Sequence, residues 1–128
     1  MPIADGVPRR VLVTGSEGYI GSVVMPVLAG AGYDATGLDV GWFAEGRLVP
    51  SDGKWTTLRR DIRDVEPDEL RGFDAVVHLA AICNDPLGEL DPELTGDMNY
   101  RATVRLAEVA RQANVAQPSA TELGKLAV

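Results

Sequence analysis

The sequence predicts an α/β protein in which flanking helices cover a parallel β-sheet. Strand-like segments alternate four times with segments of helical periodicity, which is typical of parallel strands joined by crossover helices. The run FDAVVHL at residues 73–79 is apolar over most of its length, as expected for a strand buried on both faces of a sheet. The run VLVTGSEGYIG at residues 11–21 passes from an apolar segment into three regularly spaced glycines. It predicts a buried strand, a glycine turn and a helix.

The totals of the chain limit its class. At 128 residues it is one domain at most, and its formal net charge of −7 argues against nucleic acid or an anionic membrane as a partner. Its single cysteine, Cys83, rules out an internal disulfide. We find neither a signal-peptide pattern nor the ~18 to 20 consecutive apolar residues of a membrane span. We therefore expect a cytoplasmic protein.

The chain divides into a lead-in at residues 1–9, a domain at residues 10–115 and an atypical tail at residues 116–128. Pro26 lies inside the first predicted helix and is expected to bend it. Turn residues and periodicity predict the elements that follow this helix. They are a strand at 33–39, an irregular connection at 40–53, a strand at 54–60, a short helix at 66–70, a strand at 73–79, a loop at 80–95 and a helix at 97–113.

The glycine turn has the form of an anion-binding site. Gly15 allows a sharp turn off the strand, Gly18 leaves no Cβ where a pyrophosphate would approach, and Gly21 allows the helix to pack closely on the sheet. The helix start around residues 18–20 would present unpaired N–H groups and the positive end of the helix dipole to the anion. The alternative is a glycine-punctuated turn that binds no ligand.

The second predicted strand ends in an acid, Asp39, 24 positions after Gly15. A carboxylate at the tip of this strand, about 20 residues beyond the glycines, can accept hydrogen bonds from both hydroxyls of an adenosine ribose. It would also repel a 2′-phosphate, which favours NAD over NADP. The alternative is a solvated acid at a strand end.

These motifs, in this order and spacing, resemble those of the extended short-chain dehydrogenase/reductase family. The resemblance is to its NAD-dependent epimerase/dehydratase branch, which acts on nucleotide sugars, and it extends over residues 10–115. It is carried by VLVTGSEGYIG, by GLDV at 37–40, by DIRD at 61–64, by VVHLAA at 76–81 and by MNYRATVRLAEVAR at 98–111. The fold that it implies is Rossmann-like, and here it is truncated after about four strands.

The resemblance implies a set of NAD-binding residues. The pyrophosphate would be held by Gly15, Gly18, Tyr19, Ile20 and Gly21, with Tyr19 and Ile20 acting through their backbone. The other contacts implied are Asp39 for the adenosine ribose, Asp61 and Ile62 for the adenine edge, Leu79, Ala80 and Ala81 for the segment under the cofactor, and Asn99 as a brace for the loops beside it.

Several of these residues also have a structural interpretation. Asp61 is the type of residue that caps a turn or a helix, and Ala80 and Ala81 are compatible with simple close packing. His78 has no serine or cysteine partner at a recognisable position, so we expect a structural role for it. We predict no catalytic residue and no metal ligand in this chain.

The chain also departs from the family pattern. The family uses a Tyr-x-x-x-Lys pair in proton transfer, but the residues four positions after Tyr19, Tyr33 and Tyr100 are valine, glycine and valine. Residues 116–128 are polar and interrupted by proline where the family has an aliphatic fifth strand. We expect the N-terminal part of such an enzyme, without catalytic competence as it stands. In a sheet with the strand order 3-2-1-4, residues 76–79 would form an apolar edge that favours self-association.

Three functional interpretations follow. The first is the NAD-binding portion of a nucleotide-sugar epimerase/dehydratase, with a nucleotide sugar as the substrate of the full-length family. The second is a non-catalytic dinucleotide-binding or redox-sensing module. The third is a class I methyltransferase, whose glycine turn and second-strand acid are similar. The three-glycine spacing, the DIRD segment and the HLAA segment weigh against the third.

Overall fold

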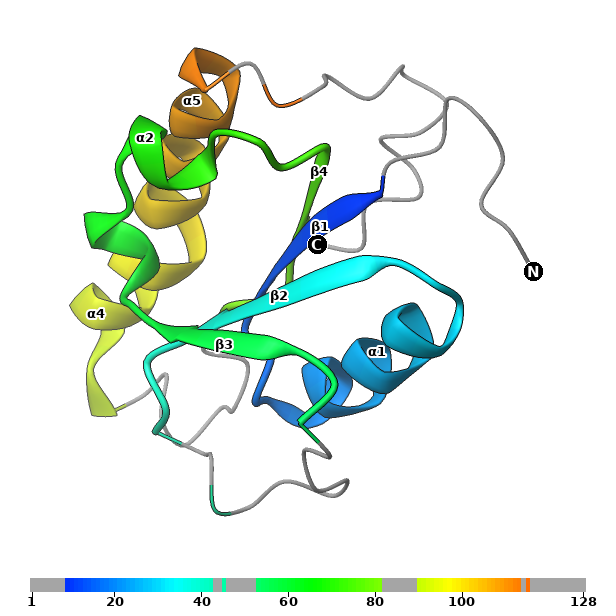
Figure 1. Cartoon of the computed structure of the whole chain (residues 1–128). Coiled ribbons are helices and arrows are strands. Elements are labelled where there is room, and N and C mark those ends of the chain that lie inside the picture. Colours follow the sequence, from blue (N-terminus) through cyan, green and yellow to red (C-terminus); the bar gives the residue numbers. More distant parts are fainter. Residues whose placement is uncertain (1–8, 43–44, 46–52, 82–89, 114, 116–128) are drawn as a thin grey trace, which may run out of the picture.

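The computed structural model describes residues 9–42, 45, 53–81, 90–113 and 115. The predicted lead-in up to residue 8, Cys83 and the predicted tail lie outside the described residues. The described elements are shown in Figure 1. In chain order they are β1 (Arg10–Thr14), α1 (Tyr19–Gly30), β2 (Asp34–Asp39), β3 (Thr56–Arg59), the 3₁₀ turn η2 (Ile62–Asp64), α2 (Pro67–Leu70), β4 (Ala75–His78), α4 (Pro92–Gly96), the π-helical turn η3 (Asp97–Arg101) and α5 (Ala102–Gln112).

The strands form one parallel sheet in the order β3-β2-β1-β4, which confirms the predicted fold class and strand order. Val11 of β1 stands opposite Ala35 of β2 and opposite Ala75 of β4. Beyond the paired strands, Gly15 N–H donates to Leu38 C=O at 2.8 Å. The carboxyl end of β1 is therefore joined to the end of β2, and the glycine turn starts between neighbouring strands.

Helices cover both faces of the sheet (Figure 1). On one face α1 packs against alternate residues of β1, and the buried cluster there is Val11, Val13, Met25 and Ala35. The opposite face carries α2, α5 and the turns beside them. Its cluster comprises Leu12, Leu38, Ile62, Val65, Leu70, Phe73, Met98, Ala102, Leu106, Val109, Ala113 and Val115. The alternation of Val11, Leu12 and Val13 between the two clusters follows the period of two in a β-strand.

One predicted boundary is wrong. Residues 80–95 were expected to form a loop, but α4 begins at Pro92. Asp91 Oδ1 accepts a hydrogen bond from Leu94 N–H at 3.0 Å, so Asp91 caps the helix and Pro92 occupies a first-turn position that needs no N–H. The aspartate–proline pair that indicated a loop is in fact a helix start. Helical structure then continues through η3 into α5.

The strands at 33–39, 54–60 and 73–79 and the short helix at 66–70 differ from their predicted bounds by one or two residues, whereas the helix predicted at 97–113 is the turn η3 followed by α5. α1 continues across Pro26 without a break, and the predicted bend stays a prediction. In α2, Glu66 N–H donates to the Glu69 side chain at 2.7 Å, which satisfies one donor at the start of this short helix. None of the helices in the described part of the chain combines the length and apolar composition of a membrane span.

Candidate functional site

A pocket lies at the carboxyl ends of β1, β2 and β4. The chain runs from β1 into α1 on one face of the sheet, whereas the helices that follow the neighbouring strand β4 cover the other face. In open parallel sheets such a switch point is where ligands bind. Seven of the predicted site residues line the pocket, namely Gly15, Gly18, Asp39, Ile62, Leu79, Ala80 and Ala81. Five further residues line it that the sequence analysis did not select, namely Leu38, Val40, Trp42, Arg60 and Met98.

Gly15 is required by its conformation and by its surroundings. Its φ angle is +70°, in the left-handed region that side chains rarely adopt. A Cβ at this position would lie 2.7 Å from Ala80 N and 2.8 Å from Leu79 C. The glycine turn and the segment after β4 therefore touch backbone to backbone, which explains why both line the same pocket.

Gly18 and Gly21 have different surroundings. A Cβ on Gly18 would have one neighbour within 4 Å, the Gly15 carbonyl oxygen at 3.3 Å, so it would otherwise project into open space. A Cβ on Gly21 would lie 2.2 Å from the same oxygen and 2.7 Å from Ser16 C. Gly21 thus lets α1 pack on the glycine turn itself, whereas the sequence analysis had expected the close contact to be with the sheet.

The start of α1 provides the partial positive charge of a helix N-terminus. Gly18 is its N-cap and has no side chain to bond the first-turn N–H groups, and the first turn contains no acidic residue. The side chains of Tyr19 and Ile20 are exposed and do not line the pocket. The contribution available from these two residues is therefore their backbone.

Asp39 is held in place by two backbone donors. Its Oδ2 accepts from Glu17 N–H at 3.0 Å and its Oδ1 accepts from Gly41 N–H at 2.7 Å. The carboxylate is only partly exposed and lines the pocket. Each of its oxygens has a fixed orientation and can accept a further hydrogen bond. A solvated acid at a strand end, the alternative interpretation, would not need two backbone donors to orient it.

An ion pair between a buried carboxylate and a half-exposed arginine, which the sequence does not indicate, lies beside Asp39. Glu17, on the glycine turn, accepts from both terminal nitrogens of Arg59 on β3, with Nη2 to Oε1 at 2.9 Å. The Glu17 side chain is 5% exposed and that of Arg59 53%. The two residues are 42 positions apart, so no local pattern joins them.

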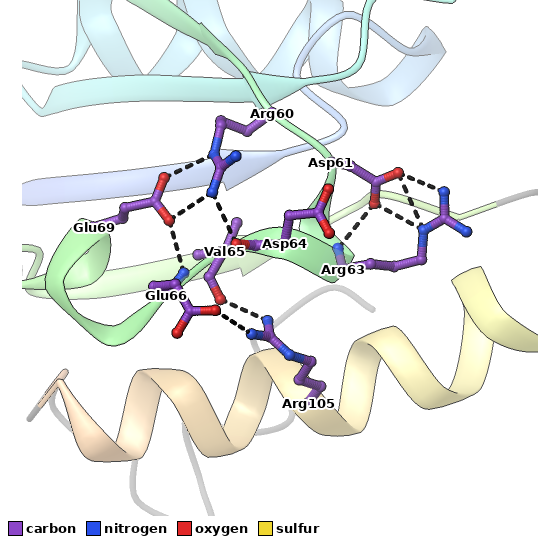
Figure 2. Close-up of polar contacts among 8 residues, drawn as sticks. All are labelled: Arg60, Asp61, Arg63, Asp64, Val65, Glu66, Glu69 and Arg105. Carbon is purple, nitrogen blue, oxygen red and sulfur yellow. Dashed lines mark hydrogen bonds and ion pairs between the residues drawn. The ribbon is translucent and has the colours of Figure 1, made fainter.

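Asp61 has the capping role that the sequence analysis left open. Its Oδ1 accepts from Arg63 N–H at 2.9 Å, and its Oδ2 lies 2.6 Å from Arg63 Nη2 (Figure 2). Hydrogen bonding from the Arg63 side chain, opposed by partial burial, lowers the pKa of Asp61. Ile62 is buried at the pocket wall, whereas Asp61 is outside the set of lining residues.

Arg60 lines the pocket, but its guanidinium is bonded elsewhere. Nε and Nη2 donate to the Glu69 carboxylate at 2.8 and 2.9 Å, and Nη2 also donates to Asp64 C=O at 2.8 Å. Figure 2 shows Arg105 of α5, whose Nη1 donates to Val65 C=O and whose Nη2 lies 2.9 Å from Oε1 of the Glu66 side chain. These contacts fasten η2 and α2 to α5, and so fix the position of Ile62.

His78 links β4 to α5 through a chain of hydrogen bonds. Its Nδ1 lies 2.6 Å from Thr14 Oγ1 and its Nε2 lies 2.8 Å from Thr103 Oγ1. Thr14 Oγ1 also accepts from Leu79 and Ala80 N–H. The Thr14 hydroxyl therefore donates to Nδ1, and a neutral ring donates from Nε2 to Thr103. Burial lowers the pKa of His78, in agreement with the structural role expected for it.

Asn99 lies apart from the pocket. It is exposed on η3 and outside the lining set, whereas its buried neighbour Met98 is part of that set. Its backbone carbonyl accepts from the Thr103 hydroxyl at 3.2 Å, so Asn99 lies next to the chain of hydrogen bonds formed by Thr14, His78 and Thr103. The signal that could have identified Met98 is its position on the apolar face of the last helix.

Comparison with known proteins agrees with this arrangement. A model of the NAD dependent epimerase/dehydratase family matches residues 11–123. A UDP-glucose 4-epimerase of Mycolicibacterium smegmatis is 32% identical over 123 residues, which are 90% of this chain and 39% of that protein. A UDP-glucose 4-epimerase of Streptomyces lividans is 36% identical over 114 residues, with 83% and 33% covered.

Solved structures show the same likeness. The UDP-glucose 4-epimerase of Thermus thermophilus in complex with NAD superposes with a TM-score of 0.69 at 31% identity, covering 83% of this chain and 35% of that one. A dTDP-glucose 4,6-dehydratase from Streptomyces venezuelae with NAD bound gives 0.71 at 34% identity, covering 83% and 37%. The chain thus spans between a third and two fifths of the length of these relatives.

Proposed function

Since this chain belongs to the NAD dependent epimerase/dehydratase family, we propose that it is the NAD-binding portion of a nucleotide-sugar epimerase or dehydratase. One observation carries the proposal: the glycine turn, the oriented carboxylate of Asp39 and the segment 79–81 line a single pocket at the switch point of the sheet. Two similar structures of this family contain NAD. Their names, with those of the sequence relatives, supply the nucleotide-sugar class.

The residues present fit the cofactor. The space beside Gly18, which a side chain would fill, and the N-terminus of α1 suit a pyrophosphate, held by Gly15, Gly18 and the backbone of Tyr19, Ile20 and Gly21. Asp39 would accept from the ribose hydroxyls. The remaining roles are those of Ile62 and Asp61 on the adenine side, Leu79, Ala80 and Ala81 beneath the cofactor, and Asn99 as a brace.

In the proposed function NAD carries out the redox chemistry, and the residues of this chain bind it. When bound, NAD supplies hydride transfer to and from a carbon of the sugar. The residues described here would bind and orient the dinucleotide, and the close backbone approach of Gly15 to Ala80 places the glycine turn directly against the segment after β4. Asp61 already accepts four hydrogen bonds from Arg63, two on each carboxylate oxygen, so an adenine amine would have to replace one of the Arg63 donors. The substrate of the whole protein would be a nucleotide sugar.

Isothermal calorimetry of the 128-residue chain with NAD and NADP tests this function. We expect saturable NAD binding, weaker NADP binding, and loss of affinity in Asp39→Ala and Gly18→Val. Asp34→Ala is the matched control, because Asp34 is an exposed acid at the opposite end of β2. A folded chain that binds neither dinucleotide, or that binds S-adenosylmethionine instead, would overturn the proposal.

We also propose that the chain self-associates through β4 and that it is cytoplasmic. In the described sheet β4 lies at an edge, and all four of its residues are half-buried, not buried. Unpaired N–H and C=O groups on an apolar edge strand favour pairing with a second copy. Sedimentation velocity over a concentration series tests the first statement, and a sedimentation coefficient that does not change with concentration would contradict it.

A further inference from the structure

Arg59 lies beside Asp39, at the margin of the pocket and outside the residues that line it. In the parallel ladder, Arg59 of β3 is the direct partner of Asp39 of β2, so the two side chains leave the same face of the sheet at its carboxyl end. A Cβ on Gly41 would lie 2.6 Å from Arg59 Nη1, and Gly41 N–H bonds Asp39. The guanidinium therefore packs against the loop that holds the Asp39 carboxylate.

Glu17 forms the hydrogen bonds of this guanidinium. It accepts from both terminal nitrogens of Arg59, and hydrogen bonding to Glu17 raises the pKa of Arg59, with a smaller contribution from the charge of Asp39. A carboxylate that is 5% exposed needs such a partner, because a buried charge without one is costly. The two terminal nitrogens of the Arg59 guanidinium, which could otherwise bind a phosphate, are thus bonded to Glu17.

We propose that Glu17 is a second specificity-determining residue for the dinucleotide, because it withholds Arg59 from the 2′-phosphate that distinguishes NADP from NAD. The inference rests on the proposed function. Asp39 would accept from the ribose hydroxyls, so a phosphate on the 2′-hydroxyl would arrive beside Asp39, where Arg59 lies. Asp39 disfavours NADP because its carboxylate repels the 2′-phosphate. Glu17 disfavours NADP because it holds the Arg59 guanidinium in an ion pair, so that this cation does not offset the repulsion.

Calorimetry with NAD and NADP on charge variants tests the inference. Glu17→Gln keeps the size of the side chain and the backbone N–H that bonds Asp39, but it removes the charge. We expect the ratio of NADP to NAD dissociation constants to fall about tenfold, the scale of one charge-assisted hydrogen bond to phosphate, with NAD affinity changed less than about twofold. In Glu17→Gln combined with Arg59→Gln the ratio should return to the starting value.

Two further variants complete the experiment. Glu66→Gln is the control for loss of a glutamate–arginine pair away from the pocket, since it removes the more exposed pair between Glu66, at the start of α2, and Arg105 of α5 and should leave the ratio unchanged. Glu17→Asp retains the buried charge but is too short to reach both nitrogens, so it should lower the ratio by a smaller factor even if Glu17→Gln does not fold.

The outcomes distinguish this inference from the proposed function. A folded wild-type chain that binds no NAD would overturn both. A wild-type chain that binds NAD, with the same ratio in both Glu17 variants, would overturn the inference alone. So would a gain in NADP affinity that persists after Arg59 is removed, because the gain would then not depend on the released guanidinium.

Discussion

The two faces of the sheet are covered to very different extents. Among the residues that the structure describes, the face under α2, η2, η3 and α5 buries a cluster of twelve apolar residues, whereas the face under α1 buries four. Yet α1 is the more apolar helix along its length: Val23 and Val27 remain 46% and 64% exposed on its outer side, while α5 places its apolar residues on one buried face. The comparison shows that burial depends on the neighbouring elements as well as on apolar composition.

The largest expected effect lies in the larger cluster. Leu106, on α5, is 3% exposed, and truncating it to alanine should lower the free energy of unfolding by about 2–5 kcal/mol because a cavity forms in a packed core. Val27→Ala, on the open side of α1, should change it by less than about 0.5 kcal/mol. Urea unfolding measures both, and equal effects would mean that the two faces are equally packed in solution.

The second effect depends on pH. Burial holds the pKa of His78 below its ordinary value of 6.5, so the unfolded state binds the proton more readily. The stability that comes from neutral His78 is present above about pH 6.5 and is lost as the pH falls through the lower pKa of the folded state. Urea unfolding at several pH values should show this decline in wild-type protein. In His78→Gln, which lacks the titrating ring, this decline in stability with falling pH should be absent. A decline of the same size in His78→Gln would assign it to another group.

The third effect concerns association. If copies pair through β4, Val23→Glu and Val27→Glu on the exposed side of α1 should each give the same sedimentation coefficient as wild type at every concentration, because neither residue lies on the sheet edge. Loss of association in these variants would move the interface from the edge strand to the open face of α1, where the exposed valines lie.

The smallest effect lies at the margin of the larger cluster. Hydrogen bonding from the Arg60 side chain lowers the pKa of Glu69 from its ordinary value of 4.5. The stabilisation by Glu69 is therefore present above about pH 4.5 and is lost as the pH falls through the lower pKa of the folded state. At neutral pH Glu69→Gln should have a slightly lower free energy of unfolding than wild type. As the pH falls through this range, that free energy should decrease less in Glu69→Gln than in wild type. Asp68→Asn, which removes the more exposed pair with Arg71, is the control and should behave like wild type.

Much of the fold could be predicted because its signals are local. The strand, turn and helix at residues 11–21 are encoded by neighbouring residues, and Gly15, which has a positive φ angle, is identified by its position between strand and helix. The prediction was wrong at residues 92–95, where Asp91 and Pro92 signal a loop and a helix start equally well. The capping bond from Leu94 to Asp91 distinguishes the two, and a sequence does not show it.

The sequence by itself determined the α/β class, the glycine turn after β1 and the acid at the tip of β2, because each depends on residue types and spacings within one segment. Only the tertiary structure decided what surrounds that acid. Glu17 meets Arg59 across 42 positions, and the parallel register places Arg59 opposite Asp39. Such contacts depend on strand pairing and packing between distant segments, for which no single segment carries a signal.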